Sequence, residues 1–147
     1  MKPEKIYPYS GMRKFGTWNV PVVDAFRIDA GAQAIGTAAC KMYHKGDNIL
    51  GFMVRVTEAV TSSGSATLQL GFTGASQLSA AVLKTTLVDG YQFGPVDKGA
   101  YMLTADDTFD SKVAVAALTA GKVDVYVIYI PAITEDLPST VHEFVTA

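Results

Sequence analysis

The chain has 147 residues, the size of a single domain, and carries a formal net charge of −2 with a pI near 5.6. This acidic balance lacks the positive field that nucleic acids and anionic membranes attract, so we expect neither as a partner. The one cysteine, Cys40, excludes an internal disulfide, and two distant histidines, His44 and His142, exclude a zinc site built from His and Cys.

Neither a secretory leader nor a membrane span is expected. Residues 1–8 contain charges and two prolines where a leader needs an apolar run. The longest strongly apolar stretch, Val125 to Ile133, contains Pro131 and is well short of the roughly 20 residues that cross a bilayer as a helix. We therefore expect a protein that is made and kept in a cytosol-like compartment.

The first half of the chain alternates apolar and polar residues, which is typical of β-strands. Weaker alternation predicts strands at Thr17–Val23, Ala25–Asp29 and Gly36–Met42. A stronger pattern predicts a half-buried strand from Leu50 to Thr57. After small polar residues and a glycine at 61–65, a further strand from Ala66 to Thr73 predicts a hairpin with it.

The second half continues with short elements. Ser76 to Lys84 is predicted as one helical turn, because Leu78 and Val82 fall on one face and Ser76 can cap it. Lys112–Leu118 and Lys122–Ile130 are predicted as a second hairpin around Thr119-Ala120-Gly121. Three weaker strands precede that hairpin, at Thr85–Val88, Tyr91–Phe93 and Tyr101–Thr104.

About eight short strands with turn signals between them, and no long internal repeat, indicate an all-β fold. We expect a single-domain antiparallel β-sandwich of the jelly-roll type over residues 21–130. An extended N-terminal arm, residues 1–20, and a C-terminal tail, residues 131–147, flank it. The arm is basic and aromatic, whereas the tail is acidic.

The arm has a high aromatic content for a segment whose prolines, Pro3 and Pro8, discourage regular structure. Its large side chains favour contact with a protein over contact with nucleic acid, and they lie either on the arm's own sheet or on a neighbour. They are Tyr7, Tyr9, Phe15 and Trp18.

The last predicted strand is apolar on both faces. Val123, Val125, Val127 and Tyr129 form one face, and Tyr126, Ile128 and Ile130 form the other. A sandwich strand normally shows one face to water, so a second layer is expected over the other. The layer is either the arm or a long loop of the same chain, or another subunit. We favour an oligomer interface through Tyr126, Ile128 and Ile130.

Residues with catalytic or ligating chemistry form no recognisable constellation. Asp106, Asp107 and Asp110 are interpreted as capping residues of a turn, because an EF-hand's glycine and distal Glu are missing; calcium binding is the alternative. His44, His142 and Cys40 stand in no nucleophile motif. We expect no enzyme activity, no catalytic residue, no metal and no cofactor.

Three segments carry a family resemblance: Gly46–Val56, Ala66–Gly71 and Ala117–Tyr129. They resemble strands and turns of the small jelly-roll head decoration proteins, or cement proteins, of tailed bacteriophages. The resemblance implies a homotrimer on the outside of the capsid that binds the major capsid protein at three-fold or quasi-three-fold positions and stabilises the shell. It also implies synthesis in the host bacterial cytoplasm and a final location on the virion.

Two other functions stay open at this point. One is a carbohydrate- or receptor-binding jelly-roll module of a phage particle, for which Tyr91, Tyr101 and Asp97 are candidate contacts. The other is a small hydrolase that would use Asp106, Asp107 or Asp110.

Overall fold

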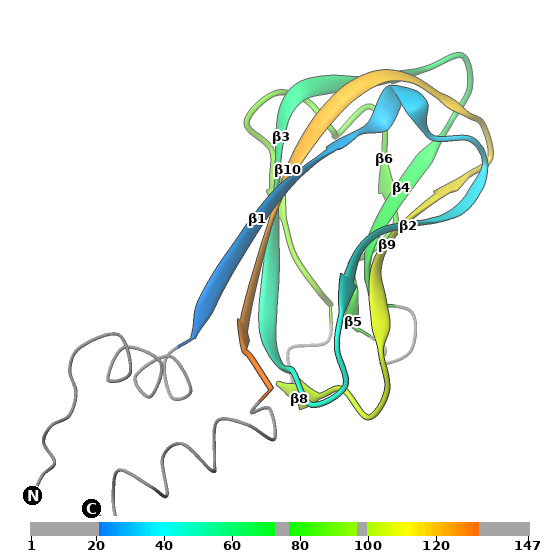
Figure 1. Cartoon of the computed structure of the whole chain (residues 1–147). Coiled ribbons are helices and arrows are strands. Elements are labelled where there is room, and N and C mark those ends of the chain that lie inside the picture. Colours follow the sequence, from blue (N-terminus) through cyan, green and yellow to red (C-terminus); the bar gives the residue numbers. More distant parts are fainter. Residues whose placement is uncertain (1–20, 73–76, 97–99, 133–147) are drawn as a thin grey trace, which may run out of the picture.

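Two antiparallel sheets form the two layers of the fold (Figure 1). The computed structural model describes residues 21–72, 77–96 and 100–132. Sheet A contains β1 (Val22–Asp29), β3 (Asn48–Ser62), β7 (Gln92–Phe93), β8 (Tyr101–Met102) and β10 (Leu118–Ile130). Sheet B contains β2 (Gly36–Tyr43), β4 (Thr67–Phe72), β5 (Gln77–Leu78), β6 (Val82–Leu83) and β9 (Asp107–Ala114). The predicted all-β sandwich is confirmed.

The order of the strands is that of a jelly roll. Sheet A runs β1-β10-β3-β7, and sheet B runs β2-β9-β4-β5. The first strand thus pairs with the last and the second with the next to last. Inside these, β3 pairs with β7 and β8, and β4 pairs with β5 and β6. The chain is a long folded hairpin wrapped into two layers, which is the jelly-roll topology.

Both predicted hairpins are wrong, because the two strands of each lie in different sheets. β3 lies in sheet A and β4 in sheet B, and β9 lies in sheet B and β10 in sheet A. The turn residues at 61–65 mark a corner where the chain crosses from sheet A to sheet B, whereas Thr119-Ala120-Gly121 lie within β10 and the second crossing is at residues 115–117. The β9–β10 corner contains Val115, which has φ 77°, a left-handed conformation that is strained for a β-branched residue.

The predicted helical turn at Ser76–Lys84 is also wrong. Its described residues form β5 and β6, where Leu78 pairs with Gly71 and Val82 with Leu68 of β4. Pairing with the buried strand β4 outweighs a helix of two turns at most, because so short a helix has little stability of its own. Residues 85–88 form no strand, and residues 107–110, predicted as a turn, begin β9. The only helical element in the described ranges is the 3₁₀ turn Ala30–Ala32, so none of them spans a membrane as a helix.

Aromatic rings join the two sheets in the core. Phe109 of β9 is fully buried, and its ring makes edge-to-face contacts with Phe26, Phe52 and Phe72 at centroid distances of 5.6, 5.0 and 5.4 Å. Phe26 and Phe52 come from sheet A, whereas Phe72 comes from sheet B. Valines of β3 and β10 belong to the same continuous core.

A polar cluster closes the side of the sandwich where β1 and β2 are the edge strands. Asp24 of β1 accepts a hydrogen bond from the Tyr43 hydroxyl at 2.9 Å, and Lys41 Nζ lies 3.2 Å from the same carboxylate. Burial and the bond to Asp24 raise the pKa of Tyr43. Charges that point inward at a sheet edge hinder pairing with another chain.

Asp47, in the turn between β2 and β3, holds the end of the last strand. Its carboxylate accepts the Ala132 N–H at 2.8 Å and the His44 N–H at 3.0 Å, and the residue is only 5% exposed. The preceding Gly46 has φ 93°, and a Cβ there would meet the Ala132 side chain at 3.0 Å. The chain therefore leaves the sandwich at a fixed place, beside β8 and the start of β1 (Figure 1).

Candidate interaction surface

The outer face of sheet A has an apolar half that is open to water in the described part of the chain. β10 lies between β1 and β3, and its side chains share rows with theirs. Val23 pairs with Ile128 and Ile128 with Gly51; in the next row Ala25 pairs with Tyr126 and Tyr126 with Met53. We name this surface the outer patch; it consists of Val23, Ala25, Met53, Tyr126 and Ile128.

The exposure of the outer patch sets it apart from the core. Val23 is 59% exposed, Met53 41% and Ile128 38%. Isolated apolar side chains on a surface are ordinary, whereas a contiguous group on one sheet face makes the outer patch a candidate interaction surface. The opposite faces of the same strands, with Val54 and Val125, are fully buried in the core.

The other half of this face is charged. Arg27 donates two hydrogen bonds to Asp124, at 2.6 and 2.9 Å, and Lys122 Nζ lies 2.7 Å from Glu58. The hydrogen bond from Arg27 lowers the pKa of the Asp124 carboxyl. A depression of about 280 Å³ marks the boundary between the two halves, with Arg27 and Asp124 on one side and Ala25 and Tyr126 on the other.

The predicted interface residues lie partly on this surface. Tyr126 and Ile128 belong to the outer patch, and Ile130 follows them on β10, half-buried and paired with Asn48. Val23 and Met53 were missed, because their place beside β10 depends on the order of the strands. The predicted arm contacts Tyr7, Tyr9, Phe15 and Trp18 lie outside the described residues.

The aspartates act as local hydrogen-bond acceptors. Asp106 accepts the Lys45 N–H at 2.8 Å, Asp107 accepts the Thr108 N–H at 2.8 Å, and Asp110 accepts the Thr108 hydroxyl at 2.6 Å. Over residues 21–72, 77–96 and 100–132, no three acidic, His or Cys side chains are placed to share a metal ion.

The nucleophile and base candidates lie in ordinary surroundings. Burial raises the pKa of the Cys40 thiol, which lowers its thiolate fraction and its reactivity. His44 is exposed, and its Nδ1 lies 3.9 Å from Asp106. His142 lies outside the described residues.

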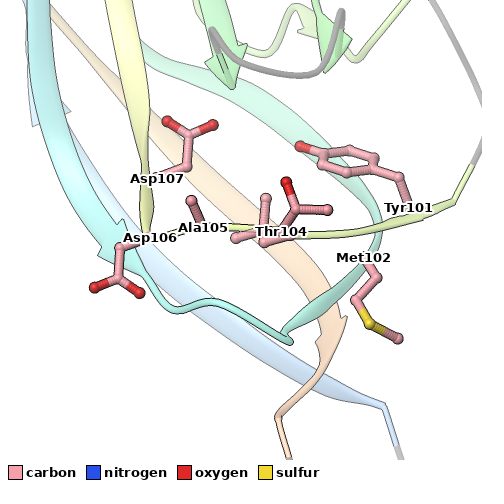
Figure 2. A pocket seen from close by; sticks show the side chains of 7 residues that line it. Tyr101, Met102, Thr104, Ala105, Asp106 and Asp107 are labelled. Atoms are coloured by element: carbon pink, nitrogen blue, oxygen red, sulfur yellow. The ribbon is translucent and has the colours of Figure 1, made fainter.

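A second hollow lies where β8 leads into β9 (Figure 2). Tyr101 and Asp107 lie on one side of this segment, and Met102 and Asp106 lie on the other. Burial raises the pKa of Tyr101. The two glycan-contact candidates that the structure describes, Tyr91 and Tyr101, both pack against the core, while Asp97 lies outside the described residues.

Comparison with known proteins gives matches in structure alone. No protein-family model matches the sequence, and no curated protein matches it significantly. A chain of the acid-stable capsid of Helicobacter pylori bacteriophage KHP30 aligns with a TM-score of 0.55 and 13% identity over 76% of this chain and 87% of that one. A chain of the cyanophage Pam1 capsid aligns with a TM-score of 0.52 and 18% identity over 76% of this chain and 84% of that one. A chain of the Ralstonia phage GP4 capsid aligns with a TM-score of 0.53 and 13% identity over 79% of this chain and 87% of that one. At these identities the likeness establishes a shared fold.

Proposed function

We propose that the protein is a non-enzymatic structural component of a phage virion, which binds the outside of the capsid as a homotrimer and stabilises the shell. The observation that carries the proposal is the fold shared with chains of three phage capsids. The alignments cover most of both partners, so those chains are similar in size to this one rather than domains of much larger proteins.

The outer patch supports the oligomeric part of the proposal. Its contiguous apolar side chains, with an ion-paired border, have the arrangement of an interface with an apolar centre and a polar rim. The major capsid protein is the proposed partner on the shell, and the aromatic arm, with Tyr7, Tyr9, Phe15 and Trp18, reaches a capsid subunit or a neighbouring protomer.

Binding to empty shells tests the proposal. Shells of the phage that encodes the chain, assembled without this protein, are mixed with it, sedimented and imaged by cryo-electron microscopy. We expect density at three-fold or quasi-three-fold positions outside the shell, and a higher temperature of shell disruption. A chain that begins at Thr17 should fold, because the sandwich starts later, but bind more weakly.

Two results would contradict the proposal. One is a full-length protein that does not bind the shells; glycan binding by such a protein would favour the receptor-binding alternative. The other is a monomer in sedimentation at micromolar concentration, which would contradict the trimeric state in the proposal.

The proposal includes no cofactor, and a melting experiment with calcium tests this. A ligand at 100 times its dissociation constant adds about 2.7 kcal/mol to the free energy of unfolding. We expect no such gain with millimolar calcium. A strong rise in melting temperature that Asp107→Asn abolishes would show a calcium site.

A further inference from the structure

We propose that the outer patch of each copy is covered by the N-terminal segment, residues 1–20, of a neighbouring copy. This inference rests on the proposed function only in taking the protein to be a trimer. It identifies the segment that covers the outer patch, so that in the trimer each copy places its N-terminal segment on a neighbouring copy.

The symmetry of a trimer limits what can cover the outer patch. In a cyclic trimer the contact is heterologous, so the outer patch of one copy meets a different surface of the next copy. The patch therefore cannot simply pair with itself. Residues 1–20 contain four large aromatic side chains, and aromatic side chains bury about 150–250 Å² each.

The shape of the surface agrees with this occupant. The depression of about 280 Å³ between Tyr126 and the Arg27–Asp124 pair has room for one large aromatic side chain. A ring placed there would contact the Tyr126 ring and the Arg27 guanidinium, both of which attract aromatic faces. Asp124 pairs with Arg27 on one side and with Arg55 of β3 on the other, so this border has one positive charge in excess and the apolar contact must supply the affinity for a basic segment.

The direction of the chain at Pro21 favours a neighbour over the same copy. Val23, a member of the patch, is the second residue of β1, so residues 1–20 join the sandwich at the border of this surface. Proline disfavours the α conformation for the residue before it and fixes its own φ. We therefore expect the chain to run into β1 in line with the strand, away from the outer face of its own sheet.

The protein contains a single tryptophan, Trp18, which reports on this segment alone. Fluorescence of the full chain, without shells, is measured beside sedimentation velocity over a dilution series. At trimer concentrations we expect blue-shifted emission and weak quenching by acrylamide. Upon dilution into monomers we expect the emission to shift to that of a solvated indole, with several-fold stronger quenching.

Two matched variants locate the contact. Met53→Lys places a charge in the outer patch and should expose Trp18 at concentrations where the unaltered protein is a trimer. Met42→Lys makes the same change at a comparably exposed methionine of sheet B, 51% against 41%, and should leave the emission unchanged. Ile128→Asn gives a second test within the patch, and circular dichroism verifies that each variant folds.

Three results would overturn the inference. They are a solvated Trp18 in the trimer, an emission that neither patch variant changes, and a buried Trp18 that stays buried when the trimer dissociates. The last would assign the contact to the same copy. None of them bears on shell binding, so the inference can fail while the proposed function holds.

Discussion

Asp47 shows how one buried carboxylate fixes the end of a strand. It accepts two backbone N–H groups, from His44 and Ala132. We expect Asp47→Ala to lower the free energy of unfolding by about 3 kcal/mol, because both donors lose a charged acceptor. Urea denaturation measures the change.

Two controls make the Asp47 experiment specific. Asp47→Asn keeps one acceptor oxygen and should cost roughly half as much. Asp89→Ala removes an exposed aspartate from a turn and should change stability by less than about 0.5 kcal/mol. Equal effects of Asp47→Ala and Asp89→Ala would show that the two hydrogen bonds contribute nothing.

Val115 stores strain at an exposed corner. It is the one non-glycine residue with a positive φ in the described part of the chain, and its side chain is 69% exposed. Asparagine tolerates the left-handed conformation better than valine, so Val115→Asn should stabilise the protein by about 1 kcal/mol. Thermal unfolding measures the gain, and the same substitution at Val88, 52% exposed, should give none.

At the scale of elements, the strands could be predicted from the sequence, but the sheet to which the chain runs after each corner could not. Alternation located β3, β4 and β10, because one face of each packs into the core. The small polar residues and the glycine at 61–65 correctly marked a chain reversal. The turn predicted at Thr119-Ala120-Gly121 lies within β10, and the chain reverses at residues 115–117 instead. Whether a reversal leads to the neighbouring strand or to the facing sheet depends on pairing between distant residues, such as Val22 with Tyr129. Local turn chemistry contains no signal for this.

β9 joins the two layers chiefly through Phe109. Replacing it by alanine removes three edge-to-face contacts and leaves a cavity between the sheets. We expect Phe109→Ala to lower the free energy of unfolding by about 3–5 kcal/mol, and Phe109→Leu by clearly less. A loss below 1 kcal/mol for the alanine variant would show that the two sheets do not depend on this ring.

The ion pair between β1 and β10 predicts a pH effect at the acid end. Asp124 has a lowered pKa in the folded protein, so its contribution is complete above the unfolded pKa of about 4 and is lost as the pH falls through the folded pKa. Asp124→Asn should therefore flatten the pH dependence of stability below about pH 4. Because both side chains reach water, the difference should shrink in 1 M salt. If the free energy of unfolding of the variant falls below pH 4 as steeply as that of the unaltered protein, the prediction is wrong.

At the scale of the whole molecule, the sequence predicts only part of the outer patch. Tyr126 and Ile128 could be placed on the outer face from sequence, because they alternate with the core valines of the same strand and so point away from the facing sheet. Val23 and Met53 could not be assigned to the same surface, since each looks like an ordinary member of an alternating strand. They become part of one surface only when β1 and β3 are placed on either side of β10.

The antiparallel pairing of the first and last strands has a consequence for engineering. Val22 and Tyr129 are partners, so anything fused to either end of the domain emerges at the same pole of the sandwich (Figure 1). Cargo attached at both ends would crowd a single pole and leave the other, with Ser63 and Ala116 at its corners, clear. If that shared pole faces the shell, the useful attachment sites for display are the corner loops rather than the ends of the chain.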